Sequence, residues 1–495
     1  MACSKRSATA VAIKWYPVCL VVQGAVVIVL LSLTFVFQTD AVDLEGFIRP
    51  LSFVFVFTSL WCLWSWYCVR GSFLDVYSLF FLAAVAFNGG QLFLEVLGIN
   101  DSGLLDNRFS PDVLVPTIHL VLTCLASMHL GALVGAGLRQ QRLQSQRDPD
   151  EVLLNAKAAR WVGWSLMALS AVPTAVYLRQ NLSTVLAKGY AALYFQGIPV
   201  GIESVWRVLS VFFVPGVLFL LAGSKGMRAN TAAAVAAVVT YALANLLIGD
   251  RGGAGYTLVA FVWLWHKSIR RFSPVGIITV FLAIAIVLPI VGITRSLSGD
   301  QRLSADLVGM LFSLDNPIVA LVKELGTTMR TVAYTLILVP GERCFDYGLG
   351  YLRATMTLVP SLYWVTSETY SSWLVWTVAP GFAKMGGGLG FSFIAEAYAN
   401  FGWLGSVLFT LLLGYMLARL ALWVDASGEP ARAALAAAFV AFTLQYARGE
   451  SAGEIGRLFW AVFVPYLAAK QIMIMARRPR DESRMCNGKA ILPNA

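Results

Sequence analysis

The sequence predicts an all-α polytopic membrane protein with about twelve transmembrane helices. Of the 495 residues, 58% are hydrophobic and 13% are charged, and the mean hydropathy is +0.72. Soluble domains carry about 25% charged residues. A helix crosses the hydrocarbon layer, about 30 Å thick, with about 20 apolar residues, and many stretches here satisfy that requirement. We therefore expect residues 1–495 to form a single membrane domain.

Each predicted helix is an apolar stretch bounded by polar or turn-forming residues. The first stretch is long and bulky and lacks a small-residue cleavage site, so we interpret it as a span and not as a cleaved signal. The predicted spans are 17–37, 50–69, 74–97, 113–137, 160–179, 206–223, 230–249, 253–267, 274–294, 397–420, 432–448 and 458–475.

Basic residues predict the orientation of these spans, because cytoplasmic loops carry an excess of Lys and Arg. Lys5 and Arg6 precede the first span, "HKSIRRF" (266–272) follows the eighth, and "RRPR" (477–480) follows the last. An even number of spans returns the chain to its starting side, so both termini are expected in the cytoplasm. The net charge of +10 then reflects topology and does not indicate nucleic-acid binding.

Two segments on the predicted outer side are longer than the other loops. Residues 180–205 contain "KGYAALYFQGIP", which suits a short amphipathic or re-entrant piece. Residues 295–396 form a loop of about 100 residues, and loops of this length are usually functional. It is rich in aromatic residues and glycine and lacks the low hydrophobicity of a disordered segment. We expect a folded cap on the outer membrane surface.

Several arginines lie on the outer side, against the cytoplasmic bias. Arg251, Arg295, Arg330 and Arg448 fall at helix ends or in the long loop. The planar fork of arginine fits phosphate oxygens two at a time, so this set suits an anionic lipid headgroup such as a diphosphate. The alternative is local pairing, for example of Asp250 with Arg251 or of Glu450 with Arg448.

The stretch "KMGGGLG" (384–390) precedes a predicted helix. Glycines such as Gly387 and Gly388 leave backbone N–H groups accessible, and a helix N-terminus favours anions. This pattern predicts an anion contact, with a flexible entry turn as the alternative.

Ser392, Glu396 and Asn400 recur every four residues and form one polar stripe on an otherwise apolar helix. Glu396 is the most deeply placed acid of the predicted topology. Nearby arginines would keep it ionised and able to accept a proton. The alternative is a structural Glu–Arg pair.

The sequence does not favour a metal site or a cofactor. "DPD" (148–150) lies in a charged inner loop and is interpreted as a solvated linker. Asp40, Asp43 and Glu45 in the first outer loop lack supporting ligands, and none of the three histidines has metal-ligand spacing with another. The seven scattered cysteines do not indicate a disulfide framework.

Two blocks carry a resemblance to a known family. They are "ELGTTMRTVAYTLILVPGERCFDYGLGYL" (324–352) and "WLVWTVAPGFAKMGGGLGFSFIAEAYANFGWLG" (373–405), with looser matches at "GDRGG" (249–253) and "RGE" (448–450). They resemble the oligosaccharide repeat-unit polymerases, the Wzy-type O-antigen polymerases of bacterial inner membranes. Arg330 and Gly341 also match an R-x10-G pattern of that family, although the frequency of glycine makes chance matches common.

This resemblance implies transfer of a growing glycan from undecaprenyl diphosphate to the terminal sugar of a new lipid-linked unit at the periplasmic face. It also implies likeness to the metal-independent branch of the GT-C-type glycosyltransferases and a possible chain-length regulator as a partner. Arg251, Arg295 and Arg330 would then bind the diphosphate, Arg448 would assist, and Glu396 would activate the acceptor hydroxyl. The remaining residues assigned to substrate binding are Tyr351, Tyr398, Asn400, Gly387 and Gly388.

Two alternatives remain open. An O-antigen ligase shares the lipid donor, but such ligases commonly carry a histidine in a large outer loop, and residues 295–396 contain none. A flippase or transporter would place charges at mid-membrane along a path, whereas the charges here gather at the predicted outer face.

Overall fold

The computed structural model describes residues 2–37, 44–137, 149–194, 201–273, 316–359 and 368–488, together with residues 275, 276, 279 and 283. All regular structure within these ranges is helical, as predicted. Nine of the described helical stretches are long and apolar enough to cross a membrane. They comprise α1 (Ala2–Val36), α2 (Ile48–Arg70), α3 (Val76–Leu97), α4 (Pro111–Gly137), α5 (Pro149–Lys188), α6 (Ile202–Ser210) joined to α7 (Phe213–Ala222), α8 (Arg228–Ile248), α18 (Phe393–Ser427) and α20 (Ser451–Arg457) joined to α21 (Val464–Gly488).

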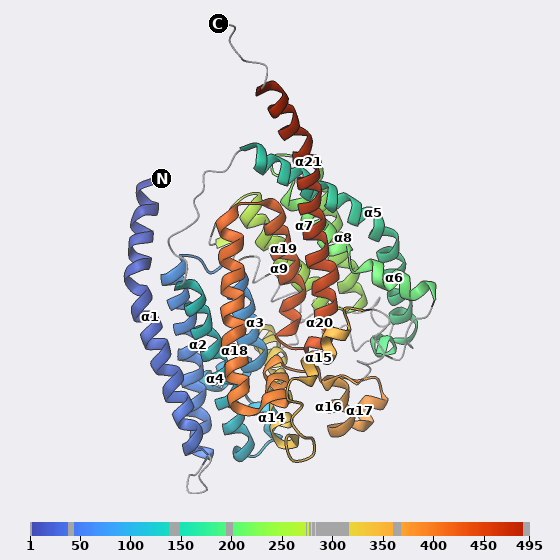
Figure 1. Ribbon diagram of the computed structural model, residues 1–495. Coiled ribbons are helices and arrows are strands. Elements are labelled where there is room, and N and C mark those ends of the chain that lie inside the picture. The colour runs from blue at the N-terminus through green and yellow to red at the C-terminus, as the bar shows by residue number, and fades with distance from the viewer. Residues whose placement is uncertain are drawn as a thin grey trace.

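Three of the twelve predicted spans are not among these nine. Two of them are helices, α9 (Arg251–Ser268) and α19 (Pro430–Tyr446), which do not meet the criteria of length and hydropathy together. Both lie in the middle of the molecule, packed on each other and on α7 (Figure 1). Residues 274–294, the third, lie outside the described residues apart from four positions. The count of twelve therefore stays a prediction.

The helix pair α4 and α18 forms the centre of the packing on one side of the molecule. Most side chains of α4 are buried, and small residues on both helices allow their backbones to approach closely. A Cβ at Gly131 would overlap the carbonyl oxygen of Leu411, and a Cβ at Gly414 would overlap the carbonyl oxygen of Met128. Close approach through small residues is the usual way in which membrane helices associate.

The two ends of the described chain lie on the same side. In Figure 1 the N-terminal end of α1 and the C-terminal end of α21 are both at the upper end. Short helices of the long loop lie at the lower end: α13 (Pro317–Leu325), α14 (Met329–Leu338), α15 (Leu349–Met356), α16 (Tyr370–Val378) and α17 (Pro380–Lys384). The loop segment is thus folded where it is described, and its helices pack on α3, α4, α18 and α20.

The segment 180–205 is helical through most of its described length. Helix α5 continues to Lys188, a 3-10 turn covers Tyr190–Tyr194, and α6 starts at Ile202. No residue of α6 is buried, and its exposed apolar side chains include Val205 and Val208. This agrees with a short amphipathic piece.

Candidate functional site

The predicted polar stripe lies at the start of α18. The helix begins at Phe393, four residues before the predicted span, because the Ser392 hydroxyl accepts a hydrogen bond from the Ile394 N–H and caps the first turn. Ser392, Glu396 and Asn400 are all buried, and Glu396 is only 1% exposed. The four-residue spacing therefore predicted their shared environment correctly.

Each member of the stripe joins α18 to a different element. The Ser392 hydroxyl donates to Asn88 Oδ1 of α3 at 2.6 Å. The Glu396 carboxylate accepts from the Ser451 N–H at 2.9 and 3.1 Å, from the Ser451 hydroxyl at 2.9 Å and from the Tyr446 hydroxyl at 3.2 Å. Asn400 Oδ1 accepts from the Gly350 N–H of α15 at 3.1 Å. The stripe thus fixes the junction of α3, α15, α19 and α20.

The expected arginine partner of Glu396 is not present among the described residues. Every donor to its carboxylate belongs to Ser451 or Tyr446, and none of the ion pairs in the described residues includes it. The reason is position: the Glu396 side chain faces the start of α20, whose first N–H group lacks a helical acceptor. A carboxylate at a helix N-terminus meets that need.

A second buried carboxylate caps α16 in the same way. Glu450 accepts from the Tyr370 N–H at 2.6 Å, from the Ser371 N–H at 3.1 Å and from the Ser371 hydroxyl at 2.5 Å. Glu450 therefore serves α16 and does not pair with its sequence neighbour Arg448, contrary to the local pairing considered from the sequence.

Aromatic rings surround this junction. Tyr351 of α15 stacks on Phe401 and Phe409, with centroid distances of 5.8 and 4.9 Å. The Tyr370 hydroxyl donates to Asp346 Oδ2 at 2.5 Å. Burial is the main cause that raises the pKa of Tyr351 and of Tyr370 above the usual value, so both phenols stay protonated at neutral pH.

Arg343 adds a cation to these rings. Its guanidinium lies 5.0 Å from the Tyr370 centroid and 4.8 Å from the Trp373 centroid, and it pairs with Asp346 at 2.8 Å. An arginine held by a carboxylate and two rings is fixed in orientation.

Two of the predicted diphosphate-binding arginines form ion pairs between the long loop and the rest of the chain. Arg251, at the start of α9, binds Glu324 of α13 through both terminal nitrogens, with Nη1 to Oε2 at 2.7 Å. Arg330 of α14 binds Asp106 Oδ2 at 2.8 Å. The alternative partner of Arg251, Asp250, instead caps α9 by accepting from the Gly253 N–H at 3.0 Å.

Cations outnumber acids around Asp106. Besides Arg330, its carboxylate contacts Lys323 at 3.4 Å and Arg108 at 4.0 Å. One carboxylate among three cations leaves the cluster of Asp106, Arg108, Lys323 and Arg330 with excess positive charge. The cluster can therefore attract an anion.

Arg448 differs from the arginines described above. It is exposed and forms no ion pair with any residue that the structure describes. Its guanidinium lies 5.4 Å from the Phe87 centroid, and its carbonyl oxygen accepts from the Phe391 N–H at 3.4 Å. The fourth predicted arginine, Arg295, lies outside the described residues.

The glycine run forms a turn between α17 and α18. Gly386 and Gly390 have positive φ angles of 71° and 70°. The Gly387 N–H donates to the Phe382 carbonyl at 2.9 Å, and a Cβ at Gly387 would overlap the Phe382 ring. Gly388 has open space around it. A contact of Gly387 or Gly388 with an anion stays a prediction, and Gly387 already has a packing role.

Sequence reasoning missed Glu454 of α20. It is 4% exposed, and its Oε1 lies 3.5 Å from Arg457 Nη1. Its Oε2 is buried without a hydrogen-bond partner in the described part of the chain. The signal in the sequence was the acid three residues before an arginine within "RGESAGEIGR" (448–457), a helical i,i+3 pair.

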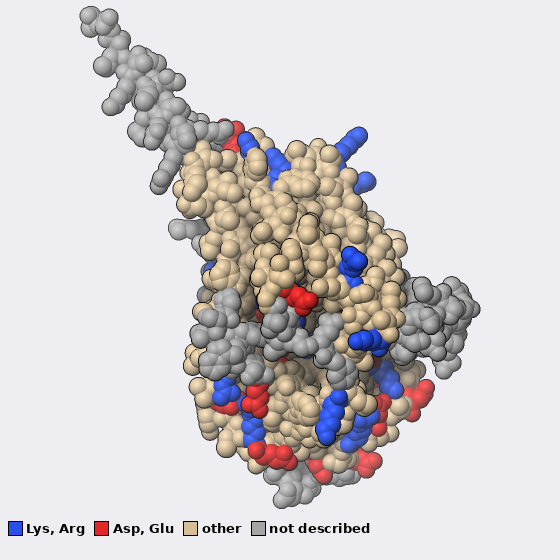
Figure 2. All heavy atoms as spheres, turned by 90° about the vertical axis from the view of Figure 1, so that its right-hand side faces the viewer, with Lys and Arg blue, Asp and Glu red and all other residues tan. Residues whose placement is uncertain are grey.

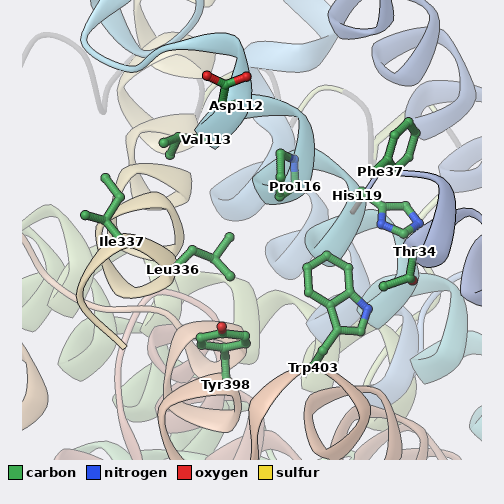
Figure 3. A pocket seen from close by; sticks show the side chains of 10 residues that line it. All are labelled: Thr34, Phe37, Asp112, Val113, Pro116, His119, Leu336, Ile337, Tyr398 and Trp403. Atoms are coloured by element: carbon green, nitrogen blue, oxygen red, sulfur yellow. The ribbon is translucent and has the colours of Figure 1, made fainter. Parts of the chain in front are cut away.

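Tyr398 lies apart from the junction and lines a cavity of about 290 Å³ between α1, α4, α14 and α18 (Figure 3). Its hydroxyl donates to the Val339 carbonyl at 3.3 Å. Among the residues with described positions, no three His, Cys, Asp or Glu side chains gather in a way that could hold a metal ion.

Charged side chains gather at the end of the molecule that carries α13 to α17. Figure 2 shows acidic and basic side chains concentrated in the lower part of one face, with a hollow above them. A band with few charged side chains separates them from a mainly basic group at the top. An uncharged band between two charged ends is the surface of a membrane protein.

The fold and this site define a polytopic helical membrane protein with a folded, charged loop region at one end. A family model described as O-antigen polysaccharide polymerase Wzy matches residues 22–477, so the chain belongs to this family and acts in O-antigen polymerisation and lipopolysaccharide biosynthesis. No curated protein and no solved structure matches the chain.

Proposed function

We propose that this protein polymerises undecaprenyl-diphosphate-linked repeat units at the periplasmic face of the bacterial inner membrane. The bond between the donor sugar and the diphosphate breaks, and a bond forms from that sugar to a hydroxyl of the acceptor unit. The acceptor proton passes to a base, and undecaprenyl diphosphate leaves as an anion. The observation that carries this proposal is that α3 connects the buried carboxylate junction to the basic cluster, in a chain of the Wzy family. Asn88 of α3 binds Ser392 at the start of α18, and Gln91, one turn later, binds the Lys323 carbonyl and the Leu105 N–H beside Asp106.

The leaving diphosphate needs fixed positive charge, which preorganised guanidinium groups supply. Arg330 and Arg251 are held by Asp106 and Glu324, and the excess charge of the Asp106 cluster favours a phosphate. Arg448 is exposed near these elements and can assist. Arg295 is assigned the same role from the sequence.

To bind the acceptor glycan, the protein must provide apolar ring faces and hydrogen-bonding groups. We assign Tyr351 and Tyr398 to sugar contacts, with Asn400 holding α15 in place through Gly350. The turn at Gly387 and Gly388 is assigned to contacts with the anionic headgroup.

We assign the base to Glu396. Its carboxylate is held by Tyr446 and Ser451, so the acceptor hydroxyl must replace one of these donors before it gives up its proton. Glu454 has a buried carboxylate oxygen without a hydrogen-bond partner in the described structure and is therefore the residue to compare with Glu396.

The base assignment is tested with Glu396→Gln and Glu454→Gln made side by side. Each change keeps the size of the side chain and removes the ability to accept a proton. With normal protein levels, we expect Glu396→Gln to lower polymerisation by roughly 100-fold or more and Glu454→Gln to have a small effect. The opposite result would move the base role to Glu454, and full activity of both would remove carboxylate base catalysis from the proposal.

The topology proposed with this function has twelve spans, both termini in the cytoplasm, and residues 295–396 as a cap over the active site. It resembles the metal-independent GT-C-type glycosyltransferases, and a chain-length regulator is a possible partner. The folded helices α13 to α17 at the end opposite the termini support this arrangement.

The function is tested with a gel of surface and lipid-linked glycan from the source bacterium, with and without the gene. Loss of a polymerase reduces the ladder to a single repeat. Long polymer retained on undecaprenyl diphosphate would indicate a ligase. Single repeats trapped on the cytoplasmic leaflet would indicate a flippase.

A further inference from the structure

The cavity at Tyr398 is separated from the Glu396 junction by α18 itself. Successive residues of a helix point about 100° apart, so Glu396 and Tyr398 face nearly opposite directions. Glu396 faces α19 and α20, whereas Tyr398 faces α1, α4 and α14. The cavity is therefore a second site at the same end of the molecule.

A break in α18 places the largest side chain of the cavity wall. Gly402 has φ 68° and ψ −163° inside the helix, a conformation that strongly favours glycine. The helix resumes with Trp403, and Figure 3 shows its ring standing in the cavity beside Tyr398 and His119. The irregular backbone at Gly402 therefore sets the position of the Trp403 ring in the cavity.

The walls combine aromatic faces with a few polar groups. The Trp403 ring stacks on His119 with centroids 5.2 Å apart, and Phe37 contacts His119 at 5.1 Å. The Trp403 Nε1 is buried and has no hydrogen-bond partner among the described residues. Asp112 is exposed at the cavity edge and forms no ion pair within the described ranges.

This chemistry fits a sugar better than a lipid tail. Aromatic rings pack against the C–H faces of a pyranose, and the hydroxyls of the sugar satisfy an indole N–H and a carboxylate. A prenyl or acyl chain would leave the buried Trp403 N–H without a partner. The volume of about 290 Å³ is at the small end of ligand cavities and suits a monosaccharide or disaccharide.

We propose that this cavity binds a sugar residue of the lipid-linked glycan, with Trp403 and Asp112 as its main contacts. The proposal rests on the proposed function, because it takes the glycan substrate from it. A sugar held here, across α18 from Glu396, would anchor the glycan away from the reacting bond and keep it in register between transfers.

Binding is measured by calorimetry on the full-length protein in detergent. The probe is the repeat-unit oligosaccharide released by mild acid from the host's lipid-linked intermediate. We expect Trp403→Phe, which keeps a ring and removes the N–H, to weaken binding by about 3- to 10-fold. Asp112→Asn, at an exposed position in the first turn of α4, should weaken it similarly. Trp161→Ala is the control, because Trp161 is 60% exposed on α5, a helix that contributes no residue to the cavity wall.

Two results would overturn the proposal. One is oligosaccharide binding that is absent, or equal in the wild type, Trp403→Phe and Asp112→Asn. The other is binding of farnesol, a prenyl chain without phosphate, that is unchanged in Trp403→Phe and lost in Trp403→Ala, which would make the cavity a site for lipid tails. Binding of the free oligosaccharide does not require polymerisation, so the two proposals can fail separately. An unchanged glycan ladder in the deletion strain would reject the polymerase function without rejecting the sugar site.

Discussion

Arg330 shows how neighbouring residues can prepare a side chain for its ligand. Its partner Asp106 lies in a run of three residues with positive φ: Leu105 at 53°, Asp106 at 60° and Asn107 at 53°. Such conformations cost about 1–3 kcal/mol each for residues other than glycine. The run is held by a hydrogen bond from the Leu105 N–H to Gln91 Oε1 at 2.8 Å. A constrained turn thus holds a carboxylate against Arg330.

We predict that Arg330→Ala reduces polymerisation by roughly 100-fold, the usual effect of removing one donor that stabilises charge in the transition state. Arg330→Lys should fall in between, because lysine keeps the charge but not the planar fork. Arg108→Ala is the matched control: Arg108 contacts the same carboxylate but its side chain is 57% exposed. The measurement is the length distribution of the glycan at equal protein levels. Equal losses for Arg330→Ala and Arg108→Ala would mean that only the total charge of the cluster matters.

The sequence predicted the buried face of the stripe but not its partners. A period of four residues places Ser392, Glu396 and Asn400 on one side of a helix, and all three are buried. The partner Ser451 lies 55 residues further along the chain, and no local pattern connects the two. The preference of buried acids for arginine suggested the wrong donor, because the unsatisfied N–H at the start of α20 was not visible in the sequence.

At the scale of elements, the pair α4 and α18 depends on glycine. Gly131 and Gly135 of "GALVG" (131–135) face α18, and Gly414 faces α4. A Cβ at Gly135 would come within 2.9 Å of the Tyr415 carbonyl oxygen. The backbone of each helix therefore occupies the space that a side chain of the other would need. Because the first part of α18 carries Glu396, this contact also sets the position of Glu396 along the helix axis relative to α4.

We predict that Gly131→Ala and Gly414→Ala each destabilise the protein by about 1–3 kcal/mol, the usual cost of overpacking. Gly24→Ala in α1 is the control, since a Cβ there meets nothing within 4 Å. The measurement is the apparent unfolding temperature of the purified protein in detergent, followed by tryptophan fluorescence. If Gly131→Ala unfolded at the same temperature as Gly24→Ala, the close contact of α4 with α18 would not contribute to stability.

Hydropathy predicted the long helices better than the short ones. Nine predicted spans coincide with stretches that are long and apolar enough to cross a membrane. The hydrocarbon layer has a nearly constant thickness, so every helix that crosses it needs an apolar stretch of similar length. Helix α19 is short and rich in alanine, and it is buried by its neighbours rather than by lipid. The short helices α13 to α17 were expected only as a folded cap. Their ends depend on caps such as Glu450 on α16, which come from distant parts of the chain.

At the scale of the whole molecule, charge is divided between two ends. The described termini lie at one end, and the helices α13 to α17, with the Asp106 cluster, lie at the other. The excess of basic residues near the termini predicts that this end is cytoplasmic. If so, the candidate site opens to the periplasm, where a flipped lipid-linked unit is available.

Two positions test this arrangement together with the number of spans. Cys344 is a free, exposed cysteine in the turn after α14, and Lys225 is exposed in the turn between α7 and α8. Three predicted spans separate them: α8, α9 and residues 274–294. An odd number of crossings places the two turns on opposite sides of the membrane.

We predict that a membrane-impermeant maleimide labels Cys344 from the periplasm in intact cells and that Cys344→Ser abolishes this labelling. Lys225→Cys, introduced into a chain in which Cys3, Cys344 and Cys486 are changed to serine, should be labelled only after the inner membrane is permeabilised. Labelling of Lys225→Cys alone from outside would invert the orientation and place the arginine clusters in the cytoplasm. Labelling of both from outside would mean an even number of crossings between them. In that case either α9, at 18 residues, or residues 274–294 does not cross the membrane, and the count of twelve spans is wrong.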